Sequence, residues 1–234
     1  FPGDFERRFR VRELDPRVHF GLNCGAASCP RVVGYGHRVS VGVVPDGASA
    51  DLGAMARGFA RDAVLWHQSG CFSLRAVLFG GPDDRREAFV GQLAEAIEDW
   101  EQRLDARPTD PDIVARRTQA HNAAEFDGRA VGEGFGWVEP TDAPFRGDTP
   151  APHVVTCHPV DDPADLDECL DLPPHHLQGV AVAEAGGADV WVDRLADLGA
   201  TRICAPGDLQ APPGDWLHDG RPNVLDWLRV TSLD

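Results

Sequence analysis

Short apolar runs alternate with amphipathic segments from Val39 onward. The run VSVGVV at residues 39–44 predicts a buried strand, which the turn signal Pro-Asp-Gly at residues 45–47 closes. Residues 51–66 carry apolar side chains at helical spacing, and residues 74–81, LRAVLFGG, predict a second strand that ends in two glycines.

The middle of the chain predicts two further helices. Pro82 stands where a proline commonly opens a helix. The apolar positions that follow recur at helical spacing, at Phe89, Leu93, Ile97 and Leu104. Residues 108–126 predict another helix, whereas residues 127–152 are rich in Gly and Pro and predict a long loop or irregular strands.

The last third alternates strand and helix patterns. Strands are predicted at residues 153–159, 177–184 and 201–207, with helices at 162–170 and 189–198 between them. A loop rich in Pro and Gly and a final short helix follow. Alternating apolar strands and helices are typical of an α/β domain with a mainly parallel sheet flanked by helices.

Composition narrows the classes of function. With 42% hydrophobic residues, a chain of 234 residues can fill a real core, and no run approaches the length of a membrane helix. The net charge is −16, from 38 acidic and 22 basic side chains. This charge repels nucleic acids and anionic membranes, so neither is expected as a partner. All 22 basic residues are Arg, which fits either adaptation to high salt or a GC-rich genome.

The cysteines predict a reducing environment. Six cysteines in 234 residues are too sparse for a disulfide scaffold. The opening residues, FPGDFERRF, lack the apolar core of a signal peptide, so a cytoplasmic location is expected. Because there is no initiator Met, we expect the chain to begin inside a longer gene product. Cys157 and Cys204 fall within predicted strands and are expected in the core, whereas Cys169 on an acidic helix fits core or surface.

Cys71 lies between a predicted helix and a predicted buried strand, where a thiol can be partly exposed. A thiolate is a strong nucleophile when its pKa is lowered. Gly70 lets the backbone approach a bound carbonyl, and Gln68 could donate to an oxyanion beside the Cys71 amide. His67 is a candidate base. The alternative is that Cys71 is a small buried residue entering a strand.

A family resemblance favours the catalytic interpretation. Residues 60–79, ARDAVLWHQSGCFSLRAVLF, resemble the active-site segment of the long-chain acyl-CoA reductases, the fatty-acid reductase component of bacterial bioluminescence. The family pattern is filled by Asp62, Trp66, Gln68, Gly70, Cys71 and Ser73. The chain departs from it at His67, where the family often has Asp, and at Leu74, where Pro is common.

A second segment, in the correct order, resembles the closing motif of the same family. The matching positions are Arg202, Gly207, Gln210, Pro212, Pro213, Trp216, His218, Asp219, Gly220, Arg221 and Pro222. Two separated motifs are more specific than either one alone. The resemblance runs from about Val32 to the end of the chain.

The resemblance implies the catalytic half of an aldehyde dehydrogenase fold and a covalent mechanism. The Cys71 thiolate would attack an acyl-CoA thioester and release CoA, and NADPH would reduce the acyl-enzyme to an aldehyde. Gln68 and the Cys71 amide would stabilise the oxyanion, with Gly70 and Ser73 contacting substrate. No Glu near Cys71 in sequence can be assigned as the general acid or base.

The cofactor is harder to place. Family members carry a dinucleotide-binding domain before the active-site Cys, yet only 70 residues precede Cys71. None of them forms a Gly-rich turn between a strand and a helix. We therefore predict a catalytic domain at residues 32–234 that lacks the upstream cofactor domain, preceded by an extension at residues 1–31. The cofactor-binding residues are left unassigned.

Residues 15–30 resemble a short motif of an uncharacterised bacterial and archaeal domain family. His19, Cys24 and Cys29 within it could contribute to a metal or thiol site, but the spacing is not that of common zinc fingers, and a loop remnant is favoured. No metal site is predicted. His175 and His176 are interpreted as a turn.

His218 and Asp219 are interpreted as structural or interface residues. The expected partners of the chain are acyl-CoA and either a second copy of the chain or an acyl-transferring subunit. Two other functions stay open: a non-catalytic remnant that serves as a binding or assembly subunit, and a thiol acyltransferase or thioesterase. The missing nucleotide turn favours these two functions. The intact segment around Cys71 favours the reductase and the acyltransferase.

Overall fold

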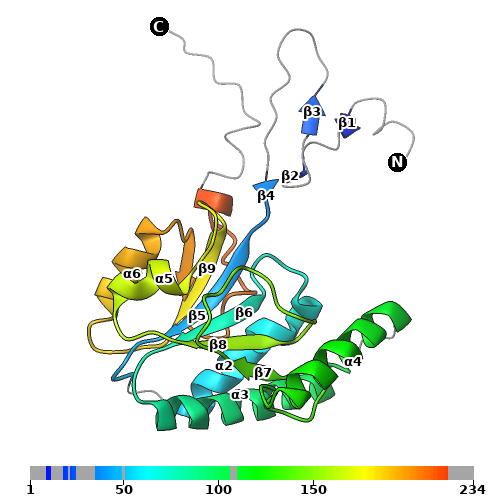
Figure 1. Ribbon diagram of the computed structural model, residues 1–234. Coiled ribbons are helices and arrows are strands. Elements are labelled where there is room, and N and C mark those ends of the chain that lie inside the picture. The colour runs from blue at the N-terminus through cyan, green and yellow to red at the C-terminus, as the bar shows by residue number, and fades with distance from the viewer. Residues whose placement is uncertain are drawn as a thin grey trace, which may run out of the picture. The chain divides into compact units, whose positions relative to one another are not determined.

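The computed structural model divides into two compact units, residues 39–216 and residues 1–38 with 217–234. Each is described separately. The described residues are the backbone of 9–11, 18–20, 22–24 and 35–36, and residues 37–48, 51–105 and 110–220 in full. Figure 1 shows the elements of the larger unit, in which strands and helices alternate.

A six-stranded sheet forms the centre of the larger unit. Its strands are β5 (Val39–Val44), β6 (Leu74–Phe79), β7 (Val138–Pro140), β8 (Val155–Pro159), β9 (Leu177–Val182) and β10 (Arg202–Cys204). They lie in the order β10-β9-β5-β6-β8-β7, and every neighbouring pair is parallel. The predicted mainly parallel sheet is confirmed. The central strand β5 is buried along its whole length, which is why it appears as an unbroken apolar run.

Helices cover both faces of this sheet (Figure 1). They are α2 (Leu52–Val64), α3 (Asp83–Leu104), the short η2 (Pro163–Asp165) and α5 (Leu166–Cys169), and α6 (Ala188–Asp197). Helix α4 (Pro111–Phe126) lies beyond the edge strand β7, where its Ala124 joins a small cluster with Trp137. Helices α2 and α3 pack on one face through a cluster that includes Phe59, Phe79 and Phe89. Helices α5 and α6 pack on the other face, where Leu166 and Leu195 share one apolar cluster with three valines of β5.

The predicted helices occur where the periodicity placed them. Asp51 caps α2 by accepting a hydrogen bond from the Gly53 amide at 3.1 Å, and Asp110 caps α4 through the Asp112 amide at 2.8 Å. Pro82 immediately precedes α3. Leu104, the last apolar position of the α3 pattern, is exposed because the helix ends there.

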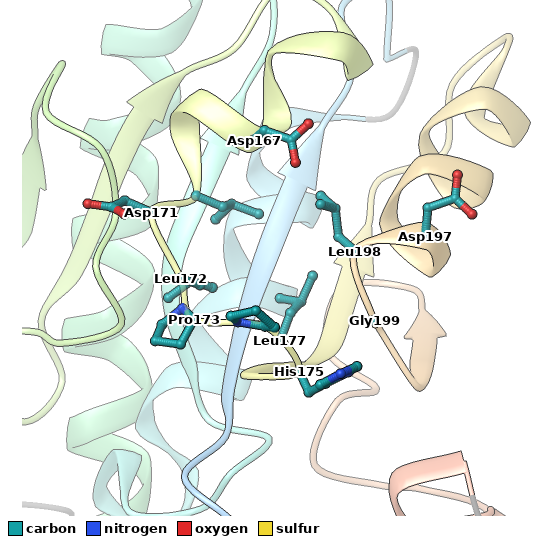
Figure 2. A pocket seen from close by; sticks show the side chains of 11 residues that line it. Asp167, Asp171, Leu172, Pro173, His175, Leu177, Asp197, Leu198 and Gly199 are labelled. Carbon is teal, nitrogen blue, oxygen red and sulfur yellow. The ribbon is translucent and has the colours of Figure 1, made fainter.

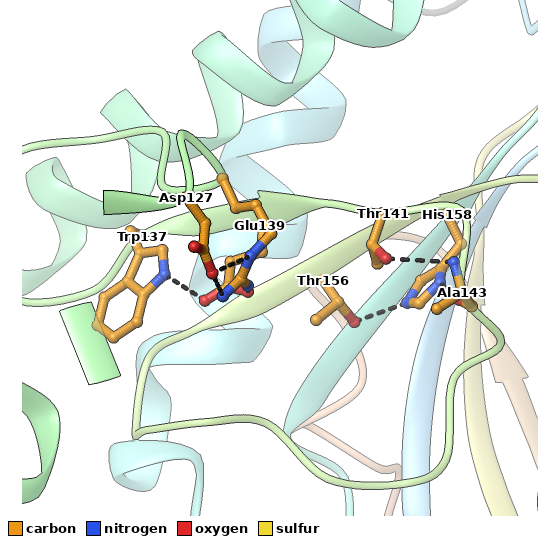
Figure 3. A network of polar contacts seen from close by, with 8 residues as sticks. Asp127, Trp137, Glu139, Thr141, Ala143, Thr156 and His158 are labelled. Carbon is orange, nitrogen blue, oxygen red and sulfur yellow. Dashed lines mark hydrogen bonds and ion pairs between the residues drawn. The ribbon is translucent and has the colours of Figure 1, made fainter. Parts of the chain in front are cut away.

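The Gly/Pro-rich stretch after α4 contains the edge strand β7, which is held by a buried carboxylate (Figure 3). Glu139 accepts a hydrogen bond from the Trp137 indole at 2.8 Å and forms an ion pair with Arg129. Arg129 also pairs with Asp127 at 3.0 Å. The network explains how a segment without apolar periodicity keeps a defined strand.

Figure 3 also shows the neighbouring His158 on β8. Its Nε2 lies 2.8 Å from the Thr156 hydroxyl, and its Nδ1 lies 2.7 Å from the Ala143 carbonyl. Burial lowers the pKa of His158. Both ring nitrogens are engaged, so we assign His158 a structural role.

The described residues of the smaller unit include two antiparallel strand pairs. Strand β1 (Phe9–Val11) pairs with β3 (Leu22–Cys24), and β2 (Val18–Phe20) pairs with β4 (Tyr35–Gly36). In its other segment, the turn η3 (His218–Gly220) carries Asp219, which pairs with Arg38 at 3.4 Å. This ion pair supports the structural role expected for Asp219.

Several sequence predictions lie outside the described residues. The final helix falls beyond Gly220, as do Arg221 and Pro222. The side chains of His19 and Cys24, and the whole of Cys29, are also outside this range. The boundary between residues 31 and 32 stays a prediction. None of the described helices has the length and hydropathy needed to cross a membrane.

Candidate active site

The segment before Cys71 has an unusual backbone. Helix α2 ends at Val64, and a short 3-10 segment, η1 (Leu65–Gln68), follows. Within it Trp66, His67 and Gln68 have φ values of 59°, 51° and 57°, in the left-handed region. This conformation costs a residue other than glycine about 1–2 kcal/mol, so three in succession require support from their surroundings.

Gln68 supplies much of that support. Its buried side-chain amide donates to the Leu74 carbonyl at 2.6 Å and to the Val154 carbonyl at 2.8 Å. Both amide hydrogens are therefore used, and they tie the turn to the amino ends of β6 and β8. The predicted oxyanion role of Gln68 is inconsistent with this arrangement, because the side chain has no hydrogen left to donate. The geometry makes Gln68 a positioning residue.

Cys71 lies on a tight turn between Gly70 and Ser73, at the amino end of β6. The Ser73 amide donates to the Gly70 carbonyl at 3.0 Å, and the Gly70 amide donates to the Ser73 hydroxyl at 3.1 Å. Cys71 is exposed, as expected for a thiol at a helix–strand junction. It is not a buried core residue. Ser73 is buried and its hydroxyl is engaged. Substrate contacts by Gly70 and Ser73 stay predictions.

Ser40 holds the same turn from the neighbouring strand β5. Its buried hydroxyl donates to the Cys71 carbonyl at 2.8 Å and accepts from the Gly179 amide at 3.1 Å. Sequence reasoning did not single out Ser40. The available signal was that Ser40 is the one polar side chain in the apolar run of residues 39–44.

The two motif segments meet at this turn. Gln210, from the second motif, donates from its Nε2 to the Ser73 hydroxyl at 2.8 Å and to the Asp62 backbone carbonyl at 3.3 Å. Asp62, from the first motif, accepts from the Gly207 amide at 2.7 Å through its Oδ2. Burial raises the pKa of Asp62 to about 7, although the Gly207 amide acts in the opposite direction.

His67, the predicted base, faces a buried pair. Its ring stacks on the ring of His153 with centroids 5.5 Å apart and planes inclined by 7°. His153 is fully buried, and its Nδ1 lies 2.6 Å from a Glu101 oxygen. Among the described residues, the His67 ring makes no hydrogen bond to Cys71. The base role of His67 therefore stays a prediction, and Glu101 and His153 are polar residues near the turn that sequence spacing did not connect.

The other described cysteines have less accessible thiols. Burial raises the pKa of Cys157 and of Cys204 to about 12, and it raises the pKa of Cys169 as well. Cys157 lies in the core as predicted, whereas Cys204 is only half-buried. Of the four cysteines within the described ranges, Cys71 is the exposed one.

A cavity of about 410 Å³ lies elsewhere, between the α5 and α6 regions (Figure 2). Its rim is acidic, with Asp167 paired to Arg194 and Asp171 paired to Arg146, and its lining contains no thiol or hydroxyl side chain. His175 contributes to the wall from a left-handed turn, which matches the predicted turn at that position. Nothing in this cavity connects it to the chemistry of Cys71.

The starts of the described helices bear on where a cofactor phosphate could bind. A carboxylate stands at the start of each of the four longest described helices: Asp51 for α2, Asp83 for α3, Asp110 for α4 and Asp189 for α6. A phosphate bound at a helix amino terminus would need the same amide groups and the same positive potential. These helix starts therefore do not fit a dinucleotide pyrophosphate. Within the described ranges, no three His, Cys, Asp or Glu side chains cluster to hold a metal ion.

Comparison with solved structures identifies the fold. The chain is similar to an indole-3-acetaldehyde dehydrogenase solved with NAD+ (TM-score 0.57, 16% identity, 76% of this chain and 39% of that one). It is also similar to the aldehyde dehydrogenase KauB from Pseudomonas aeruginosa (TM-score 0.55, 16% identity, 76% of this chain and 39% of that one). An oxidoreductase from Marinobacter aquaeolei is similar as well, with a TM-score of 0.57 and 13% identity over 76% of this chain and 40% of that one. The chain thus has an aldehyde dehydrogenase-like fold and spans about two fifths of the length of these proteins.

The family is shown by the sequence itself. A sequence model described as acyl-CoA reductase (LuxC) matches residues 22–230, beginning upstream of Val32, where the resemblance was expected to begin. None of the curated proteins compared with the chain matches it. Since the match covers most of the sequence and both of its motifs meet at Cys71, the chain belongs to the acyl-CoA reductase (LuxC) family.

Proposed function

We propose that this chain carries out the thiol step in the reduction of a long-chain acyl-CoA to a fatty aldehyde. The observation that carries the proposal is the exposed Cys71, on a turn that side chains of both family motifs, Ser73 and Gln210, hold in place. The family membership supports acyl-CoA as the substrate class. An oxidoreductase acting on acyl or aldehyde groups is the corresponding enzyme class.

In the proposed step, the Cys71 thiolate attacks the carbonyl carbon of the thioester. The carbonyl electron pair moves to oxygen, and the resulting oxyanion then re-forms the carbonyl as the bond to the CoA sulfur breaks. The products are an acyl-Cys71 thioester and CoA thiolate, which takes up a proton. The Cys71 backbone amide remains the predicted oxyanion donor, because the Gln68 side chain is engaged elsewhere.

Preorganisation is the contribution of the residues around the turn. Ser40 fixes the carbonyl of Cys71, and Ser73 fixes the amide of Gly70. Gln210 in turn holds the Ser73 hydroxyl. A nucleophile held in this way loses little conformational freedom when it reacts, which favours a near-attack geometry.

Reduction needs a hydride donor. A nicotinamide cofactor, NADPH in the proposal, would supply the hydride that converts an acyl-enzyme to an aldehyde. The helix starts of the described residues do not fit its pyrophosphate, so we assign no residue to the hydride step. This supports a second candidate function, a thiol acyltransferase or thioesterase, in which the acyl group passes from Cys71 to water or another nucleophile.

The proposal is tested with radiolabelled long-chain acyl-CoA, incubated with and without NADPH. We expect covalent label on the wild-type chain and none on Cys71→Ala, with Cys169→Ala as a matched cysteine control that retains labelling. Aldehyde formed on addition of NADPH supports the reductase, and label lost as free acid supports the thioesterase. An unlabelled wild-type chain would contradict both enzymatic functions. It would leave a binding or assembly role, in which the chain binds a second copy of itself or a partner subunit.

A further inference from the structure

A cavity of about 320 Å³ opens beside the strained turn that leads to Cys71. One wall is the turn itself, with His67, Gln68 and Ser69. The rest of the lining includes Arg75 on β6, Arg116 on α4 and residues 149–152 before β8. Only Gly70 separates Ser69 from Cys71, so their Cα atoms are within about 7 Å of each other. A group bound here would therefore lie near the thiol.

The charge of this cavity differs from that of the whole chain. Although the net charge is −16, the residues lining the cavity include two Arg and one His and no carboxylate. The Asp148 carboxylate acts on Arg75 from outside the lining. An anion entering this cavity meets a local positive potential.

The two arginines also have donors to spare. The Arg75 Nη2 lies 3.3 Å from the Gln68 carbonyl, and its Nε is buried without a hydrogen-bond partner. The Arg116 Nε makes a long contact of 3.4 Å to the Asp112 carbonyl. Neither guanidinium forms an ion pair within the described part of the chain. A partly buried guanidinium with an unsatisfied donor is costly unless a ligand completes it.

We propose that this cavity binds the phosphate groups of a nucleotide-bearing ligand beside Cys71. Phosphate oxygens match the planar donors of Arg, and the side chains of Ser69 and Thr149 lie on the same lining. Acyl-CoA and a nicotinamide dinucleotide share this chemistry. The identity of the ligand rests on the proposed function, whereas the anion site itself rests only on the cavity.

The wall formed by the turn is held in place, which makes it suitable for recognition. Gln68 anchors the turn to two carbonyls, and the His67 ring is stacked on buried His153. A ligand therefore meets a preformed surface on that side and pays little to order it. Helix amino termini are acidic throughout the described residues, so this cavity is the alternative place for phosphate recognition.

Calorimetric titration with pyrophosphate, CoA and NADPH tests the proposal on the full chain. The test variants are Arg116→Gln, which alters an exposed side chain, and Arg75→Gln/Arg116→Gln. The control is Arg57→Gln/Arg103→Gln, which removes the same charge from exposed sites on α2 and α3. Circular dichroism and thermal unfolding confirm that each variant is folded.

We expect pyrophosphate to bind the wild type. Its affinity should be about threefold lower for the single variant and at least about tenfold lower for the double variant, and it should be unchanged for the control. A matching loss for CoA identifies the substrate as the ligand, and a matching loss for NADPH identifies the cofactor. The proposal is overturned if none of the three binds the wild type, or if the control loses as much affinity as the double variant.

These outcomes are separate from those of the proposed function. If Cys71 is acylated while CoA and NADPH bind equally well to wild type and double variant, the cavity assignment fails and the thiol step stands. If pyrophosphate binding depends on Arg75 and Arg116 but Cys71 accepts no acyl group, the anion site stands and the thiol step fails.

Discussion

Polar side chains from three parts of the chain hold the turn that carries Cys71. Ser40 binds its carbonyl, and Gln210 reaches its turn through Ser73. Gln68 stabilises a left-handed segment that would otherwise be strained. These residues act on the backbone around the thiol and not on the thiol itself. We therefore expect substitutions among them to change both stability and reactivity.

The variant Gln68→Ala tests whether stability and Cys71 reactivity depend on these side chains. It leaves the Leu74 and Val154 carbonyls without their buried donor, so we expect a loss of about 1–3 kcal/mol in the free energy of unfolding. The acylation rate of Cys71 should fall as well, because the turn loses its anchor. Urea denaturation and rapid-quench labelling measure the two effects. Gln102→Ala, which removes an exposed side chain on α3, should change stability by less than about 0.5 kcal/mol, and an equal effect of both variants would contradict the account.

Asp62 predicts a pH dependence of stability. Burial raises the pKa of its carboxyl from 3.8 to about 7. Between these values the folded state holds a proton that the unfolded chain has lost, so the stability contributed by this group falls as pH rises through that window. The free energy of unfolding of Asp62→Asn, taken relative to that of the wild type, should therefore rise by on the order of 4 kcal/mol from pH 4 to pH 7. Above pH 7 this difference should level off.

Urea denaturation of both proteins across pH 4–9 measures the difference directly. Asp193→Asn on α6 is the matched control, because its carboxylate is exposed, and it should show no comparable slope. A difference between Asp62→Asn and wild type that does not change with pH would show that the carboxyl is ionised throughout this range in the folded protein.

At the scale of the elements, the close packing of α2 against the loop after β10 is what brings the second motif to the thiol. A Cβ atom added to Gly58 on α2 would lie 2.6 Å from the Pro206 carbonyl oxygen. The Arg61 guanidinium and the Asp62 carboxyl bind the Gly207 carbonyl and amide in the same contact. This contact sets the position of Gln210, and through it that of the Cys71 turn.

Gly58→Ala should push the loop away from α2. We expect a destabilisation of about 1–3 kcal/mol and slower acylation of Cys71, because overpacking against backbone atoms cannot be relieved by a rotamer change. Gly91→Ala on α3 is the control. A Cβ there meets no atom within 4 Å, so the change should stabilise the helix by about 0.5–1 kcal/mol. Destabilisation by both substitutions, measured by thermal unfolding, would contradict this account of the packing.

Local patterns predicted the long elements well. The apolar run of β5 and the helical spacing of Phe89, Leu93 and Ile97 follow from burial alone, so both elements were found near their true bounds. The left-handed turn at Trp66–Gln68 had no such signal, since its residues are not glycines. Strand β7 (Val138–Pro140) is too short to show a period, so the sequence predicted only a long loop or irregular strands there, although Val138 is buried in the core.

At the scale of the whole molecule, the sequence motifs predicted which residues surround the thiol but not what each does. The family resemblance singled out Asp62, Ser73 and Gln210. Their hydrogen bonds depend on the folded chain, which brings the two motif segments together. Gln68 was expected to donate to an oxyanion, and its donors are used elsewhere. Contacts between residues far apart in the chain, such as Glu101 with His153, leave no spacing signal that one sequence can show.

The central claim is that Cys71 forms the acyl-enzyme, and intact-mass spectrometry after rapid quenching tests it most directly. On mixing with a long-chain acyl-CoA, the wild-type chain should gain the mass of one acyl group, and peptide mapping should place that group on Cys71. Cys71→Ala should gain none, whereas Cys169→Ala should behave as wild type. An adduct of equal yield on Cys71→Ala, or no adduct on the wild-type chain, would contradict the account.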